Sequence, residues 1–160
     1  MRTRTAKPTQ AVSTTGVERG TDHQLSFALY GAANRMVRMH KPILDPLGLT
    51  FPQYLVLLEL FAGAPRTVGD LGKKLGMDTG TITPLLKRLE LSGKVTRTRD
   101  RLDERRVLVD LTAAAKELRR DLLKVNGRIQ TACQLDESEL ADLRTKLEGL
   151  AWPAPTSKTR

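Results

Sequence analysis

Residue types that carry chemistry are scarce in this chain, and each scarcity excludes a class of protein. Aromatic residues make up 4% of the 160 residues, so we expect an aliphatic core built mainly from leucine. The single cysteine, Cys133, excludes a framework of disulfide bonds within the chain and fits a reducing cytosol. No apolar run approaches the roughly 20 residues that a membrane-spanning helix needs, so we expect no membrane among the partners.

Catalytic and metal-binding patterns are missing as well. The two histidines, His23 and His40, have no cysteine or carboxylate cluster at the spacing of metal ligands. The sequence also contains no glycine-rich phosphate loop. We therefore expect a protein that is not an enzyme and that binds neither a metal nor a cofactor.

Positive charge is the first feature that the sequence has in excess. Lys and Arg number 27 against 18 Asp and Glu, which gives a net charge of +9. Such an excess favours a polyanionic partner, but it does not separate DNA from RNA or from an anionic membrane. Local patterns have to make that distinction.

The pattern of residues from Thr67 to Thr112 indicates that the polyanionic partner is DNA. Residues 67–75 predict a short helix, Gly76 to Asp78 predict a turn, and a second helix follows with apolar residues at i, i+3, i+4 and i+7 (Ile82, Leu85, Leu86 and Leu89). Two short strands, 94–99 and 106–111, then form a hairpin in which Val107, Val109 and Leu111 alternate inward. A helix, a turn, a helix and a basic hairpin together predict a winged helix-turn-helix that binds double-stranded DNA.

The outward face of the second helix supplies the first candidate contacts. Opposite the apolar stripe, small and hydroxyl-bearing residues permit close approach to base edges, and bases can hold phosphates or read guanine. The candidate DNA-binding residues on this helix are Thr79, Thr81, Thr83, Lys87 and Arg88. Pro84 removes one backbone hydrogen bond and crowds the carbonyl of Gly80, so we expect a kink or a loosened first turn there.

The hairpin supplies the second set of contacts. The acidic residues near its tip, Asp100, Asp103 and Glu104, disfavour phosphate contact, and we expect them to pair with arginines and hold the shape of the loop. This leaves Arg101 and Arg105 as the candidate DNA-binding residues of the hairpin. A solvated charged loop explains any one of these residues, but it does not explain the agreement of charge, helix pattern and hairpin.

Helices with apolar seams flank this unit on both sides. The first runs over residues 25–47, where Pro42 and Pro46 should bend or end it. The next begins at Thr50, which forms a capping box with Gln53. After the hairpin, Thr112 caps a long helix, and a last helix begins at Asp136 with Glu139 completing another capping box. The seams could close a bundle within the chain, but we favour a dimer interface because the DNA-binding unit has its own core.

These elements define the expected organisation. We predict a mainly α-helical protein with a small β-hairpin, in which a winged helix-turn-helix domain carries N- and C-terminal helices that form a dimerisation domain. The DNA-binding domain spans 49–111, and the dimerisation region spans 21–48 and 112–150. Residues 1–20 form a disordered basic arm and residues 151–160 a disordered tail.

Three motifs resemble the MarR family of winged-helix transcriptional regulators over about residues 24–150. They are Leu-Gly-Leu-Thr-Phe-Pro-Gln-Tyr ending at Tyr54, Asp-Thr-Gly-Thr-Ile-Thr-Pro-Leu-Leu-Lys-Arg-Leu ending at Leu89, and Asp-Glu-Arg-Arg-Val-Leu-Val-Asp-Leu-Thr ending at Thr112. The resemblance implies a cytoplasmic, nucleoid-associated bacterial repressor, a homodimer whose recognition helices enter successive major grooves of a palindromic operator while the wings touch minor grooves.

Within that family the chain looks similar to the repressors that sense organic hydroperoxide in the stress response. The resemblance places their sensing cysteine at Ser26 and the two tyrosines that hold its thiolate at His40 and Phe51. A hydroxyl cannot cycle through sulfenic acid, so the chain lacks the nucleophile. Cys133 lies near the position where some relatives place a resolving cysteine. The candidate sensing or ligand pocket therefore consists of Ser26, His40, Phe51 and Cys133.

Two explanations of Ser26 are open. It is either an engineered replacement of cysteine that traps the reduced form, or part of a site that binds a small ligand instead of sensing an oxidant. A third hypothesis makes the winged helix a module for protein–protein contact. Such a module would present apolar residues on the exposed face of its second helix, whereas Lys87 and Arg88 occupy that face here.

Overall fold

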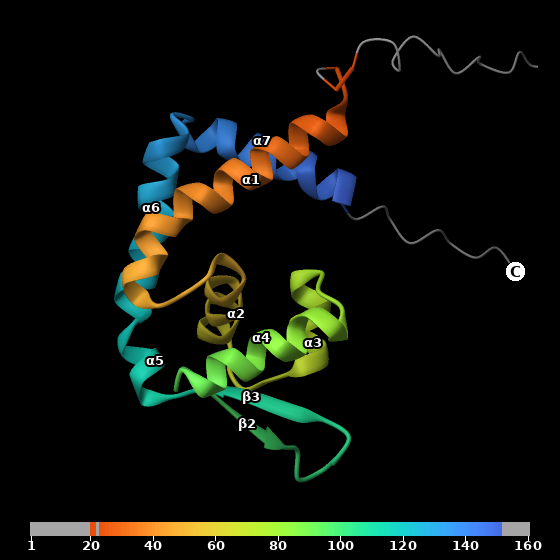
Figure 1. Ribbon diagram of the computed structural model, residues 1–160, viewed down its shortest axis with the longest axis vertical. Helices are drawn as coiled ribbons and strands as arrows, with labels where there is room; N and C mark the ends of the chain where they lie inside the picture. Colours follow the sequence, from red (N-terminus) through yellow and green to blue (C-terminus); the bar gives the residue numbers. More distant parts are fainter. Residues whose placement is uncertain (1–19, 22, 152–160) are drawn as a thin grey trace, which may run out of the picture. The chain divides into compact units, whose positions relative to one another are not determined.

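The structure is a computed structural model, and it describes residues 20, 21 and 23–151. The predicted arm and tail thus lie outside the described residues except for Gly20 and Ala151. The chain divides into two compact units, residues 1–39 and 40–160. In chain order the elements are α1 (Leu25–Leu44), η2 (Asp45–Leu47), α2 (Phe51–Ala62), β1 (Arg66–Thr67), α3 (Val68–Leu75), α4 (Thr79–Leu91), β2 (Val95–Arg99), β3 (Val107–Leu111), α5 (Ala113–Glu117), α6 (Arg119–Cys133) and α7 (Glu137–Ala151) (Figure 1). The prediction of a mainly helical chain with a small sheet is confirmed.

Side-chain caps fix where the helices begin, as the sequence predicted. The Thr50 N–H donates to Gln53 Oε1 at 2.9 Å, and the Ala115 N–H donates to Thr112 Oγ1 at 3.1 Å. Both halves of the last capping box form, because the Asp136 N–H donates to Glu139 Oε2 and the Glu139 N–H donates to Asp136 Oδ1, each at 2.9 Å. These bonds satisfy backbone donors that have no partner inside the helix.

Pro42 and Pro46 have different effects on the end of α1. Pro42 lies inside the last turn of α1, which runs through it to Leu44, whereas Pro46 lies in the short 3-10 helix η2. The helix therefore ends close to Pro46 and not at Pro42, where the predicted bend stays a prediction. The ending is completed by Gly48, whose left-handed backbone (φ 63°) is readily available only to glycine.

Pro84 does not loosen α4. The helix begins at Thr79, four residues before Thr83, and its first turn is closed by an N–H of Thr81 that donates to Asp78 Oδ1 at 2.7 Å. The Ile82 N–H also donates to the Asp78 carbonyl at 2.9 Å. Of the two expected effects of Pro84, the loosened first turn is wrong, because the Asp78 cap and the burial of Ile82 hold that turn. The expected kink stays a prediction.

The sheet has one strand more than expected. β3 is its central strand and pairs antiparallel with β2 from Val95↔Leu111 to Arg99↔Val107. On its other side β3 pairs antiparallel with β1 through Arg66↔Val109 and Thr67↔Leu108. The predicted two-stranded wing is therefore a three-stranded sheet. A strand of two residues has no visible alternation in the sequence, and it ends where Thr67 caps α3.

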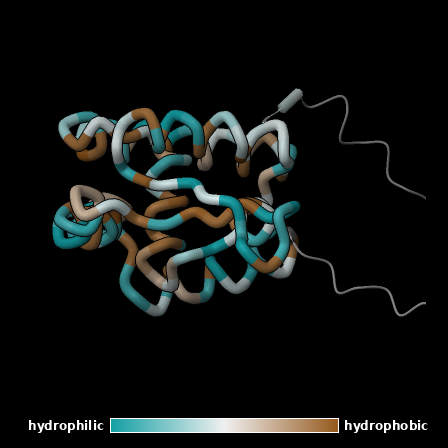
Figure 2. The backbone as a smooth tube through the Cα atoms, turned by 90° about the horizontal axis from the view of Figure 1, so that it is seen from below, coloured by the Kyte–Doolittle hydropathy of each residue, from teal (hydrophilic) through white to brown (hydrophobic). Residues whose placement is uncertain are grey.

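The winged helix has a continuous aliphatic core. The whole predicted stripe of α4 is buried, and no residue of α2 from Tyr54 to Phe61 is exposed. Figure 2 shows hydrophobic segments gathered in the interior of this unit and hydrophilic ones at its edge. The buried residues of this core are Tyr54, Val56, Leu57, Leu60, Leu71, Ile82, Leu85, Leu86, Leu89, Val95, Val109 and Leu111.

The predicted long helix after the wing is divided in two. A turn at Leu118 separates α5 from α6, and the Leu118 N–H donates to Ala115 O at 3.1 Å, three residues back instead of four. Ala115 and Leu122, on either side of the turn, are both fully buried, as are Val125 and nearly all of Ile129. Apolar spacing cannot reveal this break, since the stripe continues across it.

The last helix buries little of its apolar stripe within the described chain. Leu140 on α7 is half-buried, but Leu143, Leu147 and Leu150 are 45%, 38% and 59% exposed.

Among the described residues, no single helix is long and apolar enough to cross a membrane, and only the bent pair 25–47 with 51–62 reaches that length and composition.

Candidate nucleic-acid interface

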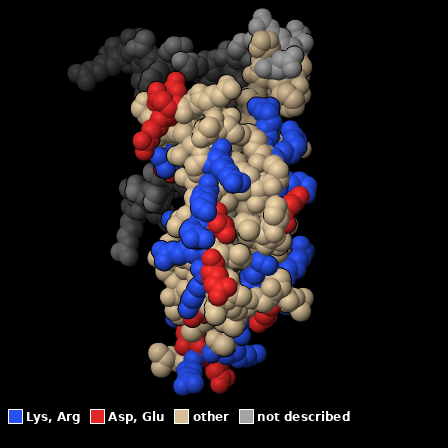
Figure 3. Space-filling view, turned by 90° about the vertical axis from the view of Figure 1, so that its left-hand side faces the viewer, with Lys and Arg blue, Asp and Glu red and all other residues tan. Residues whose placement is uncertain are grey.

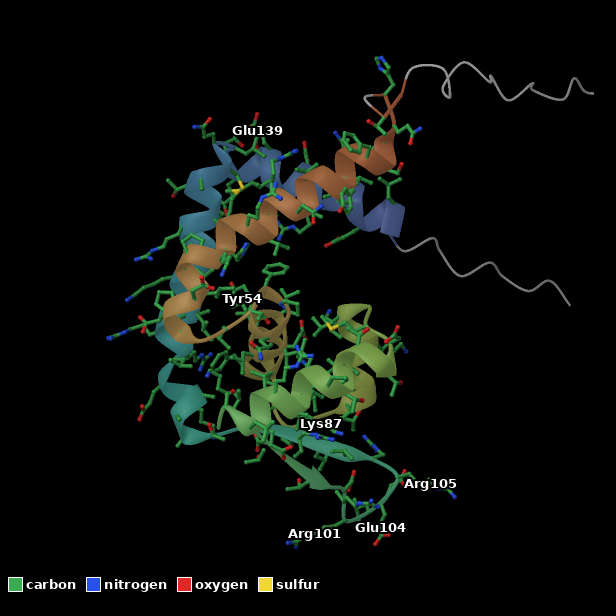
Figure 4. All side chains as sticks on the ribbon, viewed as in Figure 1. Tyr54, Lys87, Arg101, Glu104, Arg105 and Glu139 are labelled. Atoms are coloured by element: carbon green, nitrogen blue, oxygen red, sulfur yellow. The ribbon has the colours of Figure 1, made fainter. Side chains whose placement is uncertain are left out.

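The second helix of the helix-turn-helix, α4, presents a polar face to the outside. Thr79, Thr81, Lys87 and Arg88 are exposed, whereas Thr83 is half-buried. Figure 4 labels Lys87 on this helix, on the side that lies toward the wing. Four of the five predicted residues on α4 are therefore accessible to a ligand, and Thr83 is accessible only in part.

The turn between α3 and α4 holds the two helices close together. Gly76 ends α3 with a left-handed backbone (φ 64°), and the Met77 N–H donates to Gly72 O at 2.8 Å. Gly72 is buried, and a Cβ atom at this position would lie 2.8 Å from the carbonyl oxygen of Met77. Only glycine fits this close approach, which sets the angle at which α4 leaves the turn.

The loop of the wing is shaped by its aspartates. Asp100 Oδ1 accepts a hydrogen bond from the Leu102 N–H at 2.9 Å, and Asp103 Oδ1 accepts one from the Arg105 N–H at 3.1 Å. Asp100 Oδ2 also lies 3.9 Å from Arg106 Nε. Asp100 and Asp103 thus hold the loop as expected, through backbone N–H groups, and the expected pairing with an arginine side chain is seen for Asp100.

The two predicted arginines of the wing point into solvent. Arg101 and Arg105 are exposed, and Figure 4 shows both at the end of the hairpin, directed away from the body of the molecule together with Glu104. With the carboxylates of Asp100 and Asp103 turned to the backbone, these guanidinium groups are free to approach an anion.

A further arginine, Arg97, lies where the wing meets α4. Its Nη1 atom is 3.4 Å from Glu90 Oε2, and its Nε atom is buried without a hydrogen-bond partner among the described residues. Arg97 is not among the residues that the sequence predicted to bind DNA. Its position on β2, two residues from the buried Val95, marks it as an inward-facing residue.

A cavity of about 430 Å³ lies beside Arg97. It is bounded by the start of α3, by α4 and by both strands of the wing. The lining residues are Thr67, Val68, Gly69, Thr83, Arg97, Arg105, Arg106 and Val107. Of the predicted DNA-binding residues, the structure thus brings Thr83 and Arg105 to one cavity.

The outward face of α5 and α6 is also charged. Exposed bases follow one another at four-residue spacing, and Lys124 Nζ lies 3.2 Å from Asp121 Oδ1. Figure 3 looks onto this side and shows Lys and Arg side chains running down it with acids between them. The bases are Lys116, Arg120, Lys124 and Arg128. This face lies opposite the buried stripe and is a solvated face that adds to the positive field.

The predicted sensing residues are only partly brought together. The rings of His40 and Phe51 lie 4.6 Å apart at 59°, and Tyr54 joins them, 5.8 Å from His40. His40 and Tyr54 are buried, and burial raises the pKa of the Tyr54 hydroxyl. Tyr54 is not among the residues predicted for this pocket, although its position one helical turn after Phe51 indicates a shared face.

The other two residues of that predicted pocket lie at the start of α1 and at the end of α6. Ser26 is exposed on the first turn of α1, in the 1–39 unit. Cys133 is the last residue of α6 and is half-buried. Among the described residues, no group of three His, Cys, Asp or Glu side chains could hold a metal ion.

Comparison with known proteins decides what this architecture is. A family model described as the transcriptional regulator SarA/Rot matches residues 38–122, which include the helix-turn-helix and the wing. The organic hydroperoxide resistance transcriptional regulator of Bacillus subtilis (strain 168) is 39% identical over 126 residues, 79% of this chain and 86% of the relative. The chain belongs to the MarR family of winged-helix transcriptional regulators.

Other MarR-type proteins extend the likeness. The HTH-type transcriptional regulator TtmR of Methylorubrum extorquens (strain PA1) is 43% identical over 137 residues, 81% of this chain and 70% of the relative. The structure of reduced AbfR bound to DNA matches at a TM-score of 0.67 and 30% identity, over 81% of this chain and 93% of AbfR. A mutant of MarR from E. coli complexed with operator DNA matches at a TM-score of 0.71 and 28% identity, over 79% and 92%.

These matches confirm the family and the winged-helix fold predicted from the sequence. The MarR-family members are DNA-binding transcriptional regulators and not enzymes, which also confirms the expected class of protein.

Proposed function

We propose that this MarR-family chain is a repressor that binds a palindromic operator as a homodimer and releases it in response to an effector. The observation that carries the proposal is the pairing of two exposed basic elements, the outer face of α4 and the tip of the wing. An α-helix fits the major groove, and a hairpin of this size reaches the neighbouring minor groove or its phosphates.

In this proposal the two elements have different roles. Thr79, Thr81 and Arg88 at the outer face of α4 contact base edges, and Lys87 neutralises phosphate charge. Thr83, being half-buried beside the wing, contributes to the shape of the reading face and less to base contact. Arg101 and Arg105 hold the wing on the DNA.

We propose the dimer because α7 leaves apolar area exposed. Leu143, Leu147 and Leu150 follow one another at the spacing of one helical face, and each is more than a third exposed. A second copy of the chain would bury this face, as the seam of a helical interface does. In this proposal residues 49–111 bind DNA, and residues 21–48 and 112–150 form the dimer interface.

The effector follows from the residues around the predicted sensing position. The Bacillus relative is named for organic hydroperoxide resistance, but Ser26 cannot be oxidised as a cysteine can. Peroxide control therefore requires cysteine at position 26. The second candidate is a regulator in which the cluster of His40, Phe51 and Tyr54 responds to a small ligand. A protein-interaction module is disfavoured because the exposed face of α4 carries Lys87 and Arg88.

The test is DNA binding by the full chain as a function of salt. If each half-site uses about three to five phosphate contacts, log K falls with log salt at a slope of about −0.9 per neutralised phosphate. An affinity that does not change between about 50 and 200 mM salt would refute the electrostatic part of the proposal. A footprint without two-fold symmetry, or a monomer by analytical ultracentrifugation, would refute the dimer. Fractionation of bacterial cells tests the expected association with the nucleoid in the cytoplasm.

A further inference from the structure

The tip of the wing carries a fully exposed leucine. Leu102 is 97% exposed, the highest value among the exposed large apolar side chains of the described residues. Tight loops favour Gly, Asn, Asp, Ser and Pro, whose side chains suit the backbone or solvent. An isolated exposed leucine is common on protein surfaces and needs no explanation by itself. The surroundings of Leu102 make this case different.

The backbone beneath Leu102 is held in place. The Leu102 N–H donates to Asp100 Oδ1 at 2.9 Å, and the Asp100 N–H donates to Arg106 O at 3.0 Å, which closes the hairpin. On the other side of the tip, the Arg106 N–H donates to Asp103 O at 2.9 Å. The leucine is therefore presented at a fixed point, so that little backbone entropy is lost when it contacts a partner.

The charges around Leu102 indicate what that partner is. Arg101 precedes it, and Arg105 follows it across the turn, and both side chains are exposed. Asp100 and Asp103 accept hydrogen bonds from backbone N–H groups of the loop, and the exposed Glu104 leaves one further carboxylate at the tip beside these two arginines. An apolar side chain between two free guanidinium groups fits the DNA minor groove, where phosphates line the edges and sugars and base edges form an uncharged interior.

We propose that Leu102 enters the minor groove and makes the wing selective for A·T pairs. This inference rests on the proposed function, because it requires the wing to lie on DNA. In the minor groove a G·C pair differs from an A·T pair by the amino group on guanine N2, which projects from the groove floor. A leucine on the floor contacts the A·T surface but collides with that amino group and deprives it of water.

Arginine side chains in a narrow minor groove also favour A·T sequences, so the role of Leu102 has to be separated from theirs. Base analogues allow this. Replacing adenine by 2,6-diaminopurine adds the N2 amino group, and replacing guanine by inosine removes it, while both leave the hydrogen-bonding groups of the major groove unchanged. The contacts of α4 are therefore not altered by either change.

The experiment starts from a duplex that the full-length protein selects from a random-sequence library. Diaminopurine is placed at the adenines that minor-groove footprinting assigns to the wing, and affinity is measured by fluorescence anisotropy. We expect diaminopurine to weaken binding of the wild-type chain roughly tenfold, because the added amino group prevents most of the burial of the Leu102 side chain. A second duplex carries G·C pairs at these positions, and replacing their guanines by inosine should strengthen binding to it. Leu102→Ser should bind the selected duplex more weakly and respond to neither analogue.

Leu91→Ser is the matched control. Leu91 is 88% exposed at the end of α4, so its replacement removes an equally accessible leucine from a different element. This variant should keep the full response to diaminopurine. If Leu102→Ser also keeps that response, the arginines cause the selectivity and the inference is overturned. It is overturned as well if the wild-type chain does not respond, or if Leu102→Ser binds DNA unchanged. Failure to select any duplex would instead refute the proposed function.

Discussion

Arg97 on β2 and Glu90 on α4 form an ion pair that joins the wing to the helix proposed to read DNA, with Nη1 and Oε2 3.4 Å apart. The Arg97 side chain is 19% exposed and that of Glu90 is 41% exposed, so solvent screens the pair only in part. This contact helps to set the angle between the wing and α4.

We predict that Arg97→Met weakens DNA binding for all sequences alike. Loss of a partly buried pair costs about 1 kcal/mol, or roughly fivefold in affinity. Affinity measured for Arg97→Met, Glu90→Gln and the double variant gives the coupling between them. Arg99→Met, on an exposed position of the same strand, is the control. If Arg97→Met has its full effect in the Glu90→Gln background, Arg97 acts on the DNA directly and not through Glu90.

Gly72→Ala should destabilise the helix-turn-helix. The added Cβ would lie 2.8 Å from Met77 O, a backbone atom that cannot turn away. Overpacking of this kind costs about 1–3 kcal/mol. Gly69→Ala on the same helix is the control, because its Cβ would lie at an ordinary 3.9 Å from Thr67 Oγ1. Urea unfolding should move in opposite directions for the two variants, since alanine is otherwise the better helix former. Equal shifts would show that the turn accommodates the methyl group.

Replacing one arginine in each DNA-binding element should impair two different properties, sequence preference for α4 and overall affinity for the wing. Arg88→Ala on α4 should relax preference at one or two base pairs, at a cost of about 1–3 kcal/mol for the preferred sequence. Arg105→Ala in the wing should weaken binding evenly and lower the salt slope by about 1. Selection from a random-sequence library reads the first effect and a salt titration the second. An unchanged sequence profile for Arg88→Ala would mean that the reading face is placed wrongly.

The Asp78 cap should make stability depend on pH. Hydrogen bonds from the Thr81 side chain and backbone lower the pKa of Asp78 below its usual range. Because the folded-state pKa is the lower one, Asp78 stabilises the fold above its unfolded-state pKa, and this contribution is lost as pH falls through the folded-state pKa. The difference in urea midpoint between wild type and Asp78→Ala should therefore shrink from about pH 7 to about pH 3. A constant difference would show that the carboxylate charge plays no part.

Peroxide sensitivity should be restored by Ser26→Cys if the rest of the sensing site is intact. A thiolate at this position of α1 could be oxidised to sulfenic acid, whereas the hydroxyl of Ser26 cannot. The measurement is binding to the selected duplex before and after titration with an organic hydroperoxide. We expect release for Ser26→Cys and none for the Ser26 chain.

Cys133→Ala is the control for that experiment. If the Ser26 chain releases DNA on oxidation and Cys133→Ala abolishes that release, the sensing residue is Cys133, at the end of α6. No release by Ser26→Cys would favour a ligand that acts on the His40, Phe51 and Tyr54 cluster.

The helix ends and the core of the winged helix could be predicted because their causes are local. Thr112 and Asp136 hydrogen-bond to N–H groups three residues away, so capping leaves a signature in the sequence. The stripe from Ile82 to Leu89 has a helical period that appears only when one face is buried. The departures at Pro84 and Leu118 arise where tertiary packing or a single tighter hydrogen bond outweighs the local preference.

The sequence by itself determined the family, the order of the elements and the excess of positive charge on the reading unit. The tertiary structure decided which side chains meet. It joined β1 to β3, Arg97 to Glu90, and His40 to Phe51 and Tyr54, and it left Leu102 alone at the tip of the wing. Local spacing encodes faces and caps because these interactions span three or four residues. Contacts between distant segments depend instead on how whole elements pack, and no spacing in one sequence records that.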